Sequence, residues 1–335
     1  MTASSEGLVD KFGRVHRDLR ISLTDRCNLR CTYCMPADGV PWIPRPELLT
    51  SDEIVSLAVV FASLGILEIR LTGGEPLLRP DVVDVVRRLA AIEGERGPLR
   101  VSITTNGIGL ARLAEPLAEA GLERFNISLD TLRADRFATL TRRDRLTDVL
   151  EGIAAAQATG LRPLKINTVA MHGTNDDELV DLVHFARDHD AQLRFIEQMP
   201  LDAGHIWSRV RMVTGEAILD VLSAEFTLDA CAGRGSDPAQ LYFVDGGPTT
   251  VGVIASVTAP FCGSCDRVRL TADGQLRNCL FARDESDLRS LLRSSASTDD
   301  VAAAIRASVT AKLAGHGIDD PGFLQPDRPM SAIGG

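Results

Sequence analysis

Short apolar segments alternate with segments of helical spacing along the first part of the chain. The strand-like segments are rich in apolar or β-branched residues and are bounded by polar residues or glycine, as strands are. They span residues 19–23, 67–71, 99–104, 124–129, 164–170 and 192–196. Apolar residues at helical spacing predict helices at 50–64, 81–92, 110–120, 148–159 and 179–189. Alternation of this kind favours parallel strands joined by right-handed crossovers.

Two of the predicted helices begin with the sequence pattern of a capping box. Thr50 and Glu53 flank the start of the first helix, which Gly65 then ends. Asn175 and Glu178 have the same spacing before residues 179–189. The sequence therefore predicts a capping box at both helix starts.

Polar and glycine residues collect at the ends of the predicted strands. Parallel α/β sheets and barrels place their active sites at the carboxyl ends of their strands. The pattern therefore predicts a catalytic domain, and six strand–helix units rather than eight predict an incomplete (βα)6 parallel barrel. The residues at the successive strand ends are Cys27–Cys34, Thr72–Pro76, Thr104–Gly107, Ser128–Asp130, Asn167–Thr168 and Glu197–Pro200.

The regular alternation stops near residue 205. Further strands are expected at 240–244 and 251–257, a hairpin at 267–271 and 275–280, and helices at 285–293 and 299–314. We therefore expect an α/β barrel domain over 1–205 and a smaller α+β region over 206–335.

Composition and charge narrow the class of protein. The chain has 335 residues, of which 44% are hydrophobic and 24% charged, as in an ordinary globular protein. Its net charge of −10 argues against a nucleic-acid binder. The apolar run at 57–67 is too short to cross a bilayer, and residues 1–6 do not form a signal peptide. We expect a cytoplasmic protein with neither nucleic-acid nor membrane partners.

Cys27, Cys31 and Cys34 form the most informative run of the sequence. In a reducing compartment, clustered cysteines indicate metal or redox chemistry rather than disulfides. Three thiolates are one ligand short of a closed zinc site, but they leave one iron of a four-iron cluster open for chemistry. A zinc site that takes its fourth ligand from elsewhere in the chain is the alternative.

A second triplet consists of Cys262, Cys265 and Cys279, and it leaves Cys231 as a small apolar residue. A zinc ion with His316 or Asp266 as fourth ligand is again an alternative. Arg267 and Arg269 lie two residues apart on one predicted strand, so their side chains share a face. After a metal site this pair indicates an anion clamp, and a solvated strand face is the alternative.

Two further features predict contacts with charged groups of a ligand. Gly73 and Gly74 allow the backbone to approach a ligand closely, and Glu75 can accept a hydrogen bond from an ammonium group. A glycine-rich turn with an incidental glutamate is the alternative. Lys165 lies inside an apolar strand and, because a buried lysine without a partner is costly, we expect it to meet an anion. The alternative is a lysine that reaches solvent at the strand end.

The first triplet with Tyr33, followed by Gly73–Pro76, resembles the radical S-adenosylmethionine superfamily. The resemblance implies a 4Fe–4S cluster on Cys27, Cys31 and Cys34 whose fourth iron binds S-adenosylmethionine and cleaves it to a 5′-deoxyadenosyl radical. The second triplet, Arg267-Val268-Arg269 and the terminal Gly334-Gly335 resemble the GTP 3′,8-cyclase family, from Arg17 to Gly335.

That resemblance implies a role for each motif residue. A second 4Fe–4S cluster is expected on Cys262, Cys265 and Cys279, with its open iron at the guanine, and Gly334-Gly335 are expected to enter the pocket. The implied S-adenosylmethionine residues are Tyr33, Gly74, Glu75, Ser128 and Met199. The implied GTP residues are Arg20, Arg70, Thr104, Lys165, Arg267 and Arg269, of which Arg267 and Arg269 are the expected catalytic pair.

The implied reaction is the first step of molybdenum cofactor biosynthesis. The radical removes the C3′ hydrogen of GTP and the new carbon radical attacks C8, giving (8S)-3′,8-cyclo-7,8-dihydroguanosine 5′-triphosphate. The family further implies a flavodoxin or ferredoxin as electron donor, a functional link to cyclic pyranopterin monophosphate synthase, and a homodimer. The alternatives are a peptide-modifying radical enzyme with an auxiliary cluster, or a non-catalytic iron–sulfur or zinc-stabilised binding protein.

Overall fold

The computed structural model describes residues 7–94 and 96–334, so the predictions for residues 1–6 and for Gly335 lie outside the described residues. Alternating side chains in the central strands separate an apolar face from a polar face. In β1 (Asp18–Ser22) and β2 (Glu68–Thr72), leucine and isoleucine join the core with the helices. Arg20 and Arg70, at the positions between them, line a central cavity. The strands therefore have a polar inner face and an apolar outer face.

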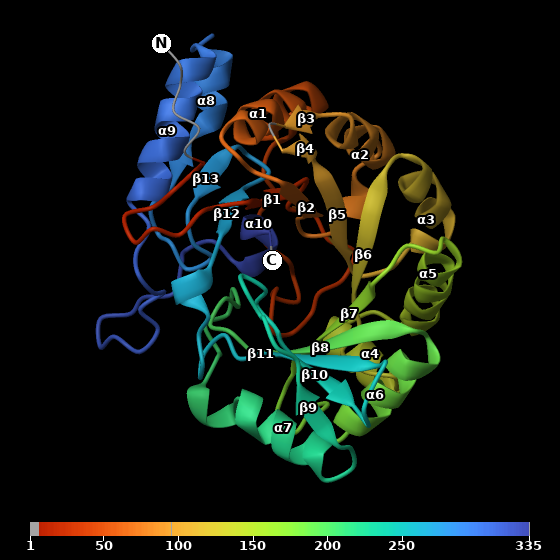
Figure 1. Cartoon of the computed structure of the whole chain (residues 1–335). Coiled ribbons are helices and arrows are strands. Elements are labelled where there is room, and N and C mark those ends of the chain that lie inside the picture. Colours follow the sequence, from red (N-terminus) through yellow and green to blue (C-terminus); the bar gives the residue numbers. More distant parts are fainter. Residues whose placement is uncertain (1–6, 95, 335) are drawn as a thin grey trace.

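The predicted succession of parallel strands is confirmed. The strands β1, β2, β5, β6, β7 and β8 are neighbours in that order, and each pairs in parallel with the next. Figure 1 shows them curving around a centre, with helices outside. The bounds not yet given are Arg100–Thr105 for β5, Leu122–Ser128 for β6, Leu164–Ala170 for β7 and Ala191–Glu197 for β8.

The helices that follow these strands pack on the outer face. The five predicted helices are present, with ends that differ by a few residues, whereas α4 (Ala134–Thr141) and α7 (Gly215–Ser223) were not predicted. Two short strands, β3 (Glu93–Gly94) and β4 (Gly97–Pro98), pair with each other after α2. The predicted helices are α1 (Ser51–Ser63), α2 (Val82–Ala90), α3 (Leu110–Glu119), α5 (Leu146–Ala158) and α6 (Leu179–Asp188).

One of the two predicted capping boxes is wrong. The Thr50–Glu53 box is present with both of its hydrogen bonds, but the residue before α6 has no side-chain cap. Asn175 instead accepts from the Met171 backbone N–H at 2.8 Å and donates to the Asp130 carbonyl at 2.7 Å. The Glu178 carboxylate accepts from the Leu132 backbone N–H at 2.8 Å. Tertiary hydrogen bonds therefore replace the local cap.

Strands from the C-terminal part extend both edges of the same sheet. β11 (Thr250–Ile254) pairs in parallel with β8, and β12 (Arg267–Leu270) pairs in parallel with β1. The predicted hairpin is formed by β12 and β13 (Gln275–Arg277). Beyond β11 the sheet continues into β10 (Gln240–Val244) and β9 (Leu228–Ala230). Because both parts share one sheet, the boundary near residue 205 stays a prediction.

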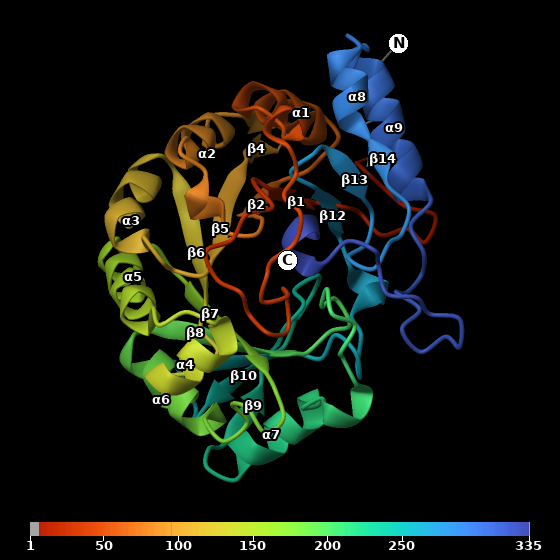
Figure 2. The ribbon, with the colours of Figure 1, turned by 180° about the vertical axis from the view of Figure 1, so that it is seen from behind.

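The last segments form one edge of the sheet and then enter its centre. β14 (Ser286–Asp287) takes the place of the first residues of a predicted helix, and α8 (Leu288–Arg293) begins after it. The next helix, α9 (Thr298–Thr310), ends four residues before the predicted end at 314. The short α10 (Met330–Ile333) lies at the centre of the ring in both views (Figures 1 and 2).

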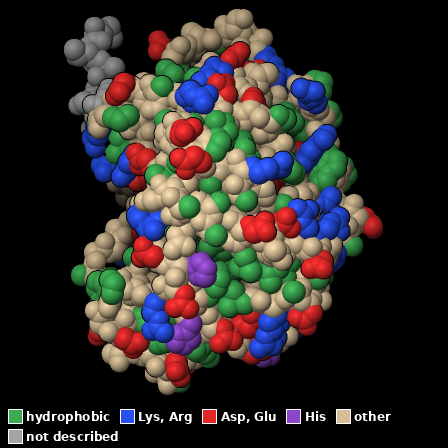
Figure 3. Space-filling view, turned by 90° about the vertical axis from the view of Figure 1, so that its right-hand side faces the viewer, with side chains coloured by type: hydrophobic (Ala, Val, Ile, Leu, Met, Phe, Trp, Pro, Cys, Tyr) green, Lys and Arg blue, Asp and Glu red, His purple; other side chains and the backbone are tan. Residues whose placement is uncertain are grey.

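The outer surface differs in charge from the inner face. On the face shown in Figure 3, acidic and basic side chains are interspersed over the helices.

In the described part of the chain, no helix combines the length and apolar character that a bilayer span requires.

Candidate functional site

One cavity of about 320 Å³ collects both cysteine triplets and most of the predicted site residues. This volume is in the range of ligand pockets, roughly 300–1,000 Å³. Lys165 is the exception, because it does not line the cavity. The predicted residues that do are Arg20, Cys27, Cys31, Tyr33, Cys34, Arg70, Gly74, Glu75, Thr104, Ser128, Met199, Cys262, Cys265, Arg267, Arg269 and Cys279.

The first cysteine loop is held by the glycine turn that follows β2. The Gly74 backbone N–H donates to the Thr24 carbonyl at 2.8 Å. A Cβ atom at Gly73 would lie 2.4 Å from the Thr24 carbonyl oxygen, and one at Gly74 would lie 2.3 Å from that of Arg26. The glycines therefore allow the turn to pack against the backbone that leads into Cys27, a structural need separate from any contact with a ligand.

Glu75 ties the same turn to the end of β5. Its side chain is 1% exposed, and it accepts from Thr105 Oγ1 and the Asn106 N–H, both at 2.7 Å, and from the Leu77 N–H at 2.9 Å. Burial raises the pKa of Glu75 to about 7, although these hydrogen bonds lower it. The carboxylate thus holds the strand ends together, and its expected contact with a ligand ammonium stays a prediction.

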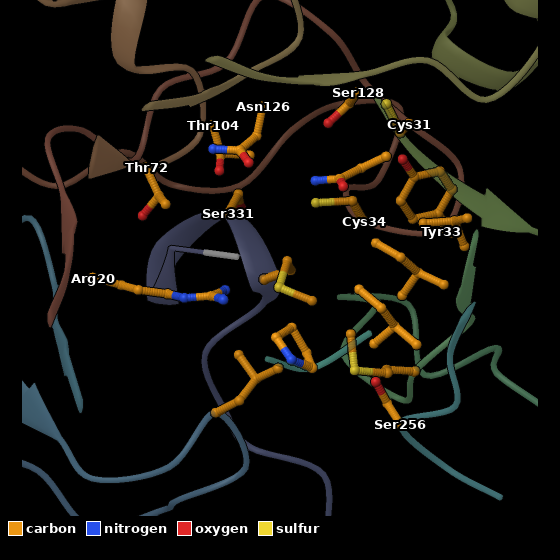
Figure 4. A pocket seen from close by; sticks show the side chains of 18 of the residues that line it. Arg20, Cys31, Tyr33, Cys34, Thr72, Thr104, Asn126, Ser128, Ser256 and Ser331 are labelled. Atoms are coloured by element: carbon orange, nitrogen blue, oxygen red, sulfur yellow. The ribbon is translucent and has the colours of Figure 1, made fainter. Parts of the chain in front are cut away.

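Tyr33 is fixed by a carboxylate at the end of β6. Its hydroxyl donates to Asp130 Oδ2 at 2.8 Å, and Asp130 Oδ1 accepts from the Val169 N–H at 2.9 Å. Burial raises the pKa of Asp130 to about 6. In Figure 4, Tyr33 lies with Cys31 and Ser128 on one side of the cavity, and Arg20 extends toward the centre from the other.

The three thiols of the first triplet are free and lie near one another. Burial raises the pKa of Cys27 to about 11, and the charge of Glu75 adds to that shift. Burial raises the pKa of Cys34 to about 12, and Cys27 adds to that shift. Burial raises the pKa of Cys31 well above its ordinary value, and Asp130 and the other two cysteines raise it further. The Leu29 N–H donates to Cys27 Sγ at 3.4 Å. Grouped thiols with raised pKa values lose their protons only when a strong positive partner, such as a metal ion, stabilises the thiolates.

Cationic side chains lie close to the second triplet. Burial alone would raise the pKa of Cys265, but Lys312 and Arg267 lower it below the usual value. His316, a possible zinc ligand in the sequence, has both ring nitrogens engaged, with the Ser256 carbonyl at 3.0 Å and the Ile318 N–H at 3.1 Å. Among residues 7–94 and 96–334, no three His, Cys, Asp or Glu side chains are placed to hold a single metal ion.

A row of arginines crosses three neighbouring strands beside the cysteines. Arg20 is in register with Arg269 of β12 on one side and with Arg70 of β2 on the other. Burial lowers the pKa of Arg20 well below its ordinary value, and both neighbouring arginines lower it further. The Nε atoms of Arg20 and Arg70 are buried without a hydrogen-bond partner. Such packing of like charges indicates a site for an anion.

Sequence reasoning missed two further cations of this inner face, Arg124 of β6 and Arg194 of β8. The Nε atom of Arg124 has no hydrogen-bond partner. Arg194 forms two hydrogen bonds with Asp237, of 2.8 and 3.1 Å. Arg194 alternates with buried apolar neighbours, as Arg20 and Arg70 do, whereas Arg124 lies between the exposed Glu123 and the buried Phe125. For Arg194, that period of two was the available signal.

Lys165 lies among these cations, away from the cavity wall. It is 7% exposed and is in register with Asn126 of β6. Burial lowers its pKa to about 7, and Arg194 and Arg124 lower it further, whereas Asp237 raises it. We call Arg20, Arg70, Arg124, Lys165, Arg194, Arg267 and Arg269 the cation cluster.

The C-terminal tail reaches the strand ends. Arg269 Nη1 donates to the carbonyl oxygen of Gly334. Gly334 has a φ of +86°, and a Cβ atom there would lie 2.5 Å from Thr72 Oγ1. Only glycine fits this position without strain.

Comparison with known proteins identifies the superfamily and the fold of the chain. Residues 21–186 match the family model of the radical SAM superfamily, and residues 191–318 match that of Molybdenum Cofactor Synthesis C. The crystal structure of Streptococcus suis SuiB bound to S-adenosylmethionine has a TM-score of 0.56, covering 87% of this chain and 68% of its own at 16% identity. SuiB bound to precursor peptide SuiA has a TM-score of 0.59 over 96% and 77% at 12% identity, so these likenesses show the fold alone. The chain is a radical SAM protein with a mixed α/β fold and a large, mostly parallel sheet.

Curated relatives then give the family. The GTP 3′,8-cyclase of Streptomyces coelicolor is 60% identical over 100% of this chain and 99% of its own length. The GTP 3′,8-cyclase 2 of Mycobacterium tuberculosis strain H37Rv is 53% identical over 98% and 92%. The chain belongs to the GTP 3′,8-cyclase family of molybdenum cofactor synthesis.

Proposed function

We propose that this chain converts GTP to 3′,8-cyclo-7,8-dihydroguanosine 5′-triphosphate, with S-adenosylmethionine and two 4Fe–4S clusters in an incomplete (βα)6 barrel. The observation that carries the proposal is the single cavity onto which both cysteine triplets and the arginines open. Reductant and cofactor supply a carbon-centred radical, and the chain must hold GTP within reach of it. An enclosed site also excludes water and oxygen from the reaction.

The cysteines fit the two clusters in number and in chemistry. Cys27, Cys31 and Cys34 would hold the cluster that binds S-adenosylmethionine, and thiolates are the usual ligands of such clusters. Cys262, Cys265 and Cys279 would hold the second cluster, since this triplet lines the same cavity. Three cysteines for each would leave one iron of each cluster open, the first for S-adenosylmethionine and the second for the guanine.

The residues next to the first triplet fit S-adenosylmethionine. Tyr33, held by Asp130, would orient the cofactor, and Gly74 and Ser128 would line its pocket with Met199. Glu75 would act by fixing the glycine turn against the cysteine loop as well as by accepting from the amino group. These roles follow the positions of the side chains at the ends of β1, β2 and β6.

The cation cluster fits the triphosphate. A triphosphate carries about four negative charges, and guanidinium groups pair well with phosphate oxygens. Arg267 and Arg269 would hold it beside the second cluster, with Arg20 and Arg70 next to them on the adjacent strands. Thr104, on β5, lines the same cavity. Arg194 also lines the cavity, whereas Arg124 and Lys165 lie on neighbouring strands without lining it, so they would act on the phosphates through their charge. Bound anions would relieve the repulsion within the cation cluster.

Lys165 makes GTP binding depend on pH. Its pKa of about 7 in the free protein lies below the ordinary value of 10.5, so at pH 8 it is mostly neutral. A triphosphate raises that pKa, so binding takes up about one proton, and affinity falls as pH rises above about 7. At pH 8 the nucleotide itself binds little proton, because a phosphate loses its last proton near pH 6. Calorimetry in buffers of different ionisation enthalpy should detect this uptake in the native protein and much less in Lys165→Met; equal uptake in both would contradict the assignment.

The alternative functions fit the observations less well. A peptide-modifying radical enzyme would share the fold of SuiB, but nothing beyond the fold follows from 12–16% identity. A zinc-stabilised binding protein has no need of a row of buried arginines. The electron donor of flavodoxin or ferredoxin type, the link to cyclic pyranopterin monophosphate synthase, the homodimer and the cytoplasmic location stay predictions.

The decisive experiment is anaerobic turnover of the reconstituted protein. With dithionite and S-adenosylmethionine, 5′-deoxyadenosine and the cyclised nucleotide are measured by mass spectrometry with GTP, with ATP and without nucleotide. The proposal expects a cyclised product with GTP alone. Cofactor cleavage without that product would remove GTP as substrate, and absence of cleavage with both clusters bound would exclude radical chemistry.

A further inference from the structure

Lys312 places a buried ammonium group against the second cysteine triplet. It lies two residues beyond the end of α9 and is 3% exposed. Its Nζ donates to Cys265 Sγ at 3.5 Å and to the Arg267 carbonyl oxygen at 2.7 Å. Lys312 thus contacts one of the three sulfur atoms of the triplet from the protein side.

The hydrogen bonds of Lys312 to the protein do not offset the free energy of burying its ammonium group. An ammonium group buried away from water requires a charged partner to be favourable. In the described part of the chain, the hydrogen-bond partners of Lys312 are a thiol and a backbone carbonyl, not a carboxylate. A sulfur atom that bears negative charge would be the missing partner.

A second cation holds the segment after Lys312 in place. Arg14 donates to the Leu313 carbonyl at 2.7 Å, to the Ala314 carbonyl at 3.0 Å and to the Cys262 carbonyl at 2.7 Å. It thereby ties the residues after Lys312 to the loop of the triplet. The charge of Arg14 is balanced by Asp10, whose Oδ2 lies 2.6 Å from Arg14 Nε. Of these two buried cations, Lys312 is the one directed at a ligand sulfur.

We propose that Lys312 tunes the second 4Fe–4S cluster by hydrogen bonding to Cys265 and by its positive charge, which stabilises the more reduced state. The inference rests on the proposed function, in which Cys265 is a cluster ligand. Reduction potentials of such clusters depend on net charge and on hydrogen bonds to the sulfur atoms. One electron from an external reductant adds one negative charge to the cluster, and a fixed ammonium group beside it lowers the energy of that state. Lys312 is therefore a positioning residue, with no contact to substrate required.

A purely structural role predicts a different result. If Lys312 served only to anchor the start of β12 through the Arg267 carbonyl, its replacement would lower the melting temperature of the metal-free protein. If it serves the cluster, the metal-free Lys312→Met variant should be as stable as the native protein or more so, because an unbalanced buried charge has been removed.

The test isolates the second cluster in the full-length chain. Cys27, Cys31 and Cys34 are replaced by alanine, and the protein is reconstituted with iron and sulfide. Its midpoint potential is measured by anaerobic titration with electron paramagnetic resonance. In this background, Lys312→Met is expected to shift the midpoint potential to more negative values. Lys312→Arg, which keeps the positive charge, is expected to keep the midpoint close to that of the protein with native Lys312. Lys11→Met, at an exposed lysine, should leave it unchanged.

The possible failures can be told apart. A background protein that binds no iron would overturn the second cluster of the proposed function, and this inference with it. A background protein that binds its cluster but shows one midpoint for native Lys312 and for Lys312→Met would overturn the inference alone. Loss of the cluster in Lys312→Met, with retention in Lys312→Arg, would support it.

Discussion

Replacing Cys31 with alanine is expected to reduce the release of 5′-deoxyadenosine by far more than about 100-fold. Loss of a partner that merely supports a metal ligand costs roughly 10–100-fold, and Cys31 is proposed as a ligand itself. The Cys31 thiol lines the cavity, and Asp130 and the other two cysteines of the triplet are its titratable neighbours. With two ligands left, the cluster that anchors S-adenosylmethionine should not assemble.

Cys231→Ala provides the matched control. Cys231 is half-buried and does not line the cavity, and its N–H pairs with the Leu241 carbonyl at 2.8 Å. Iron per chain should fall from about eight to about four in Cys31→Ala and should not change in Cys231→Ala. Anaerobic iron analysis and mass spectrometry measure both quantities. A Cys31→Ala protein with full iron and undiminished cleavage would give the first triplet a merely structural role.

The sequence indicates the candidate metal ligands because the chemistry of clustered thiols leaves few choices. Thiolates at the spacing of Cys27, Cys31 and Cys34 have few uses in a reducing compartment. The order of the parallel strands was also predictable, since each βα unit has a local pattern. Family membership, shown by the relatives, then supports the resemblance drawn from these motifs.

The inner face of the sheet was predicted only in part. Arg194 alternates with buried apolar neighbours, which is a local signal, whereas Arg124, next to the exposed Glu123, looks like a surface residue in an isolated strand. Lys165 was expected to meet an anion, but its distance from the cavity wall depends on the register of β7 with its neighbours. Long-range pairing of this kind has no local signature in one sequence.

Local patterns were misleading where a side chain found a tertiary partner. Asn175 and Glu178 have the spacing of a cap, yet both bond to the segment that follows β6. Tertiary hydrogen bonds between buried groups outweigh a cap of about 1 kcal/mol. The C-terminal strands could not be assigned to sheet edges from sequence because parallel neighbours such as β12 and β1 are separated by most of the chain.

Arg269→Ala is expected to lower cyclisation of GTP by roughly 10²–10³-fold, the usual effect of removing one preorganised donor from a charged site. Arg269 is buried beside Arg20 and Arg267, and it holds the carbonyl of Gly334. The variant would lose both the proposed phosphate partner and the anchor of the tail. Rates of product formation under saturating and limiting GTP measure the effect. Arg87→Ala, at an exposed arginine on α2, is the control and should leave both rates unchanged.

A double-mutant cycle separates the two roles of Arg269. Gly334→Ala keeps Arg269 but places a Cβ atom 2.5 Å from Thr72 Oγ1 at a φ of +86°, so the tail must move. A displacement of about 1 Å near reacting groups can cost roughly 10²-fold. If Arg269 acts by anchoring the tail, the double variant should be no slower than the slower single variant, because residues that work as a unit are not additive. If the fold-decreases in rate of the two single variants multiply in the double variant, Arg269 acts on the phosphates and the tail acts independently of it.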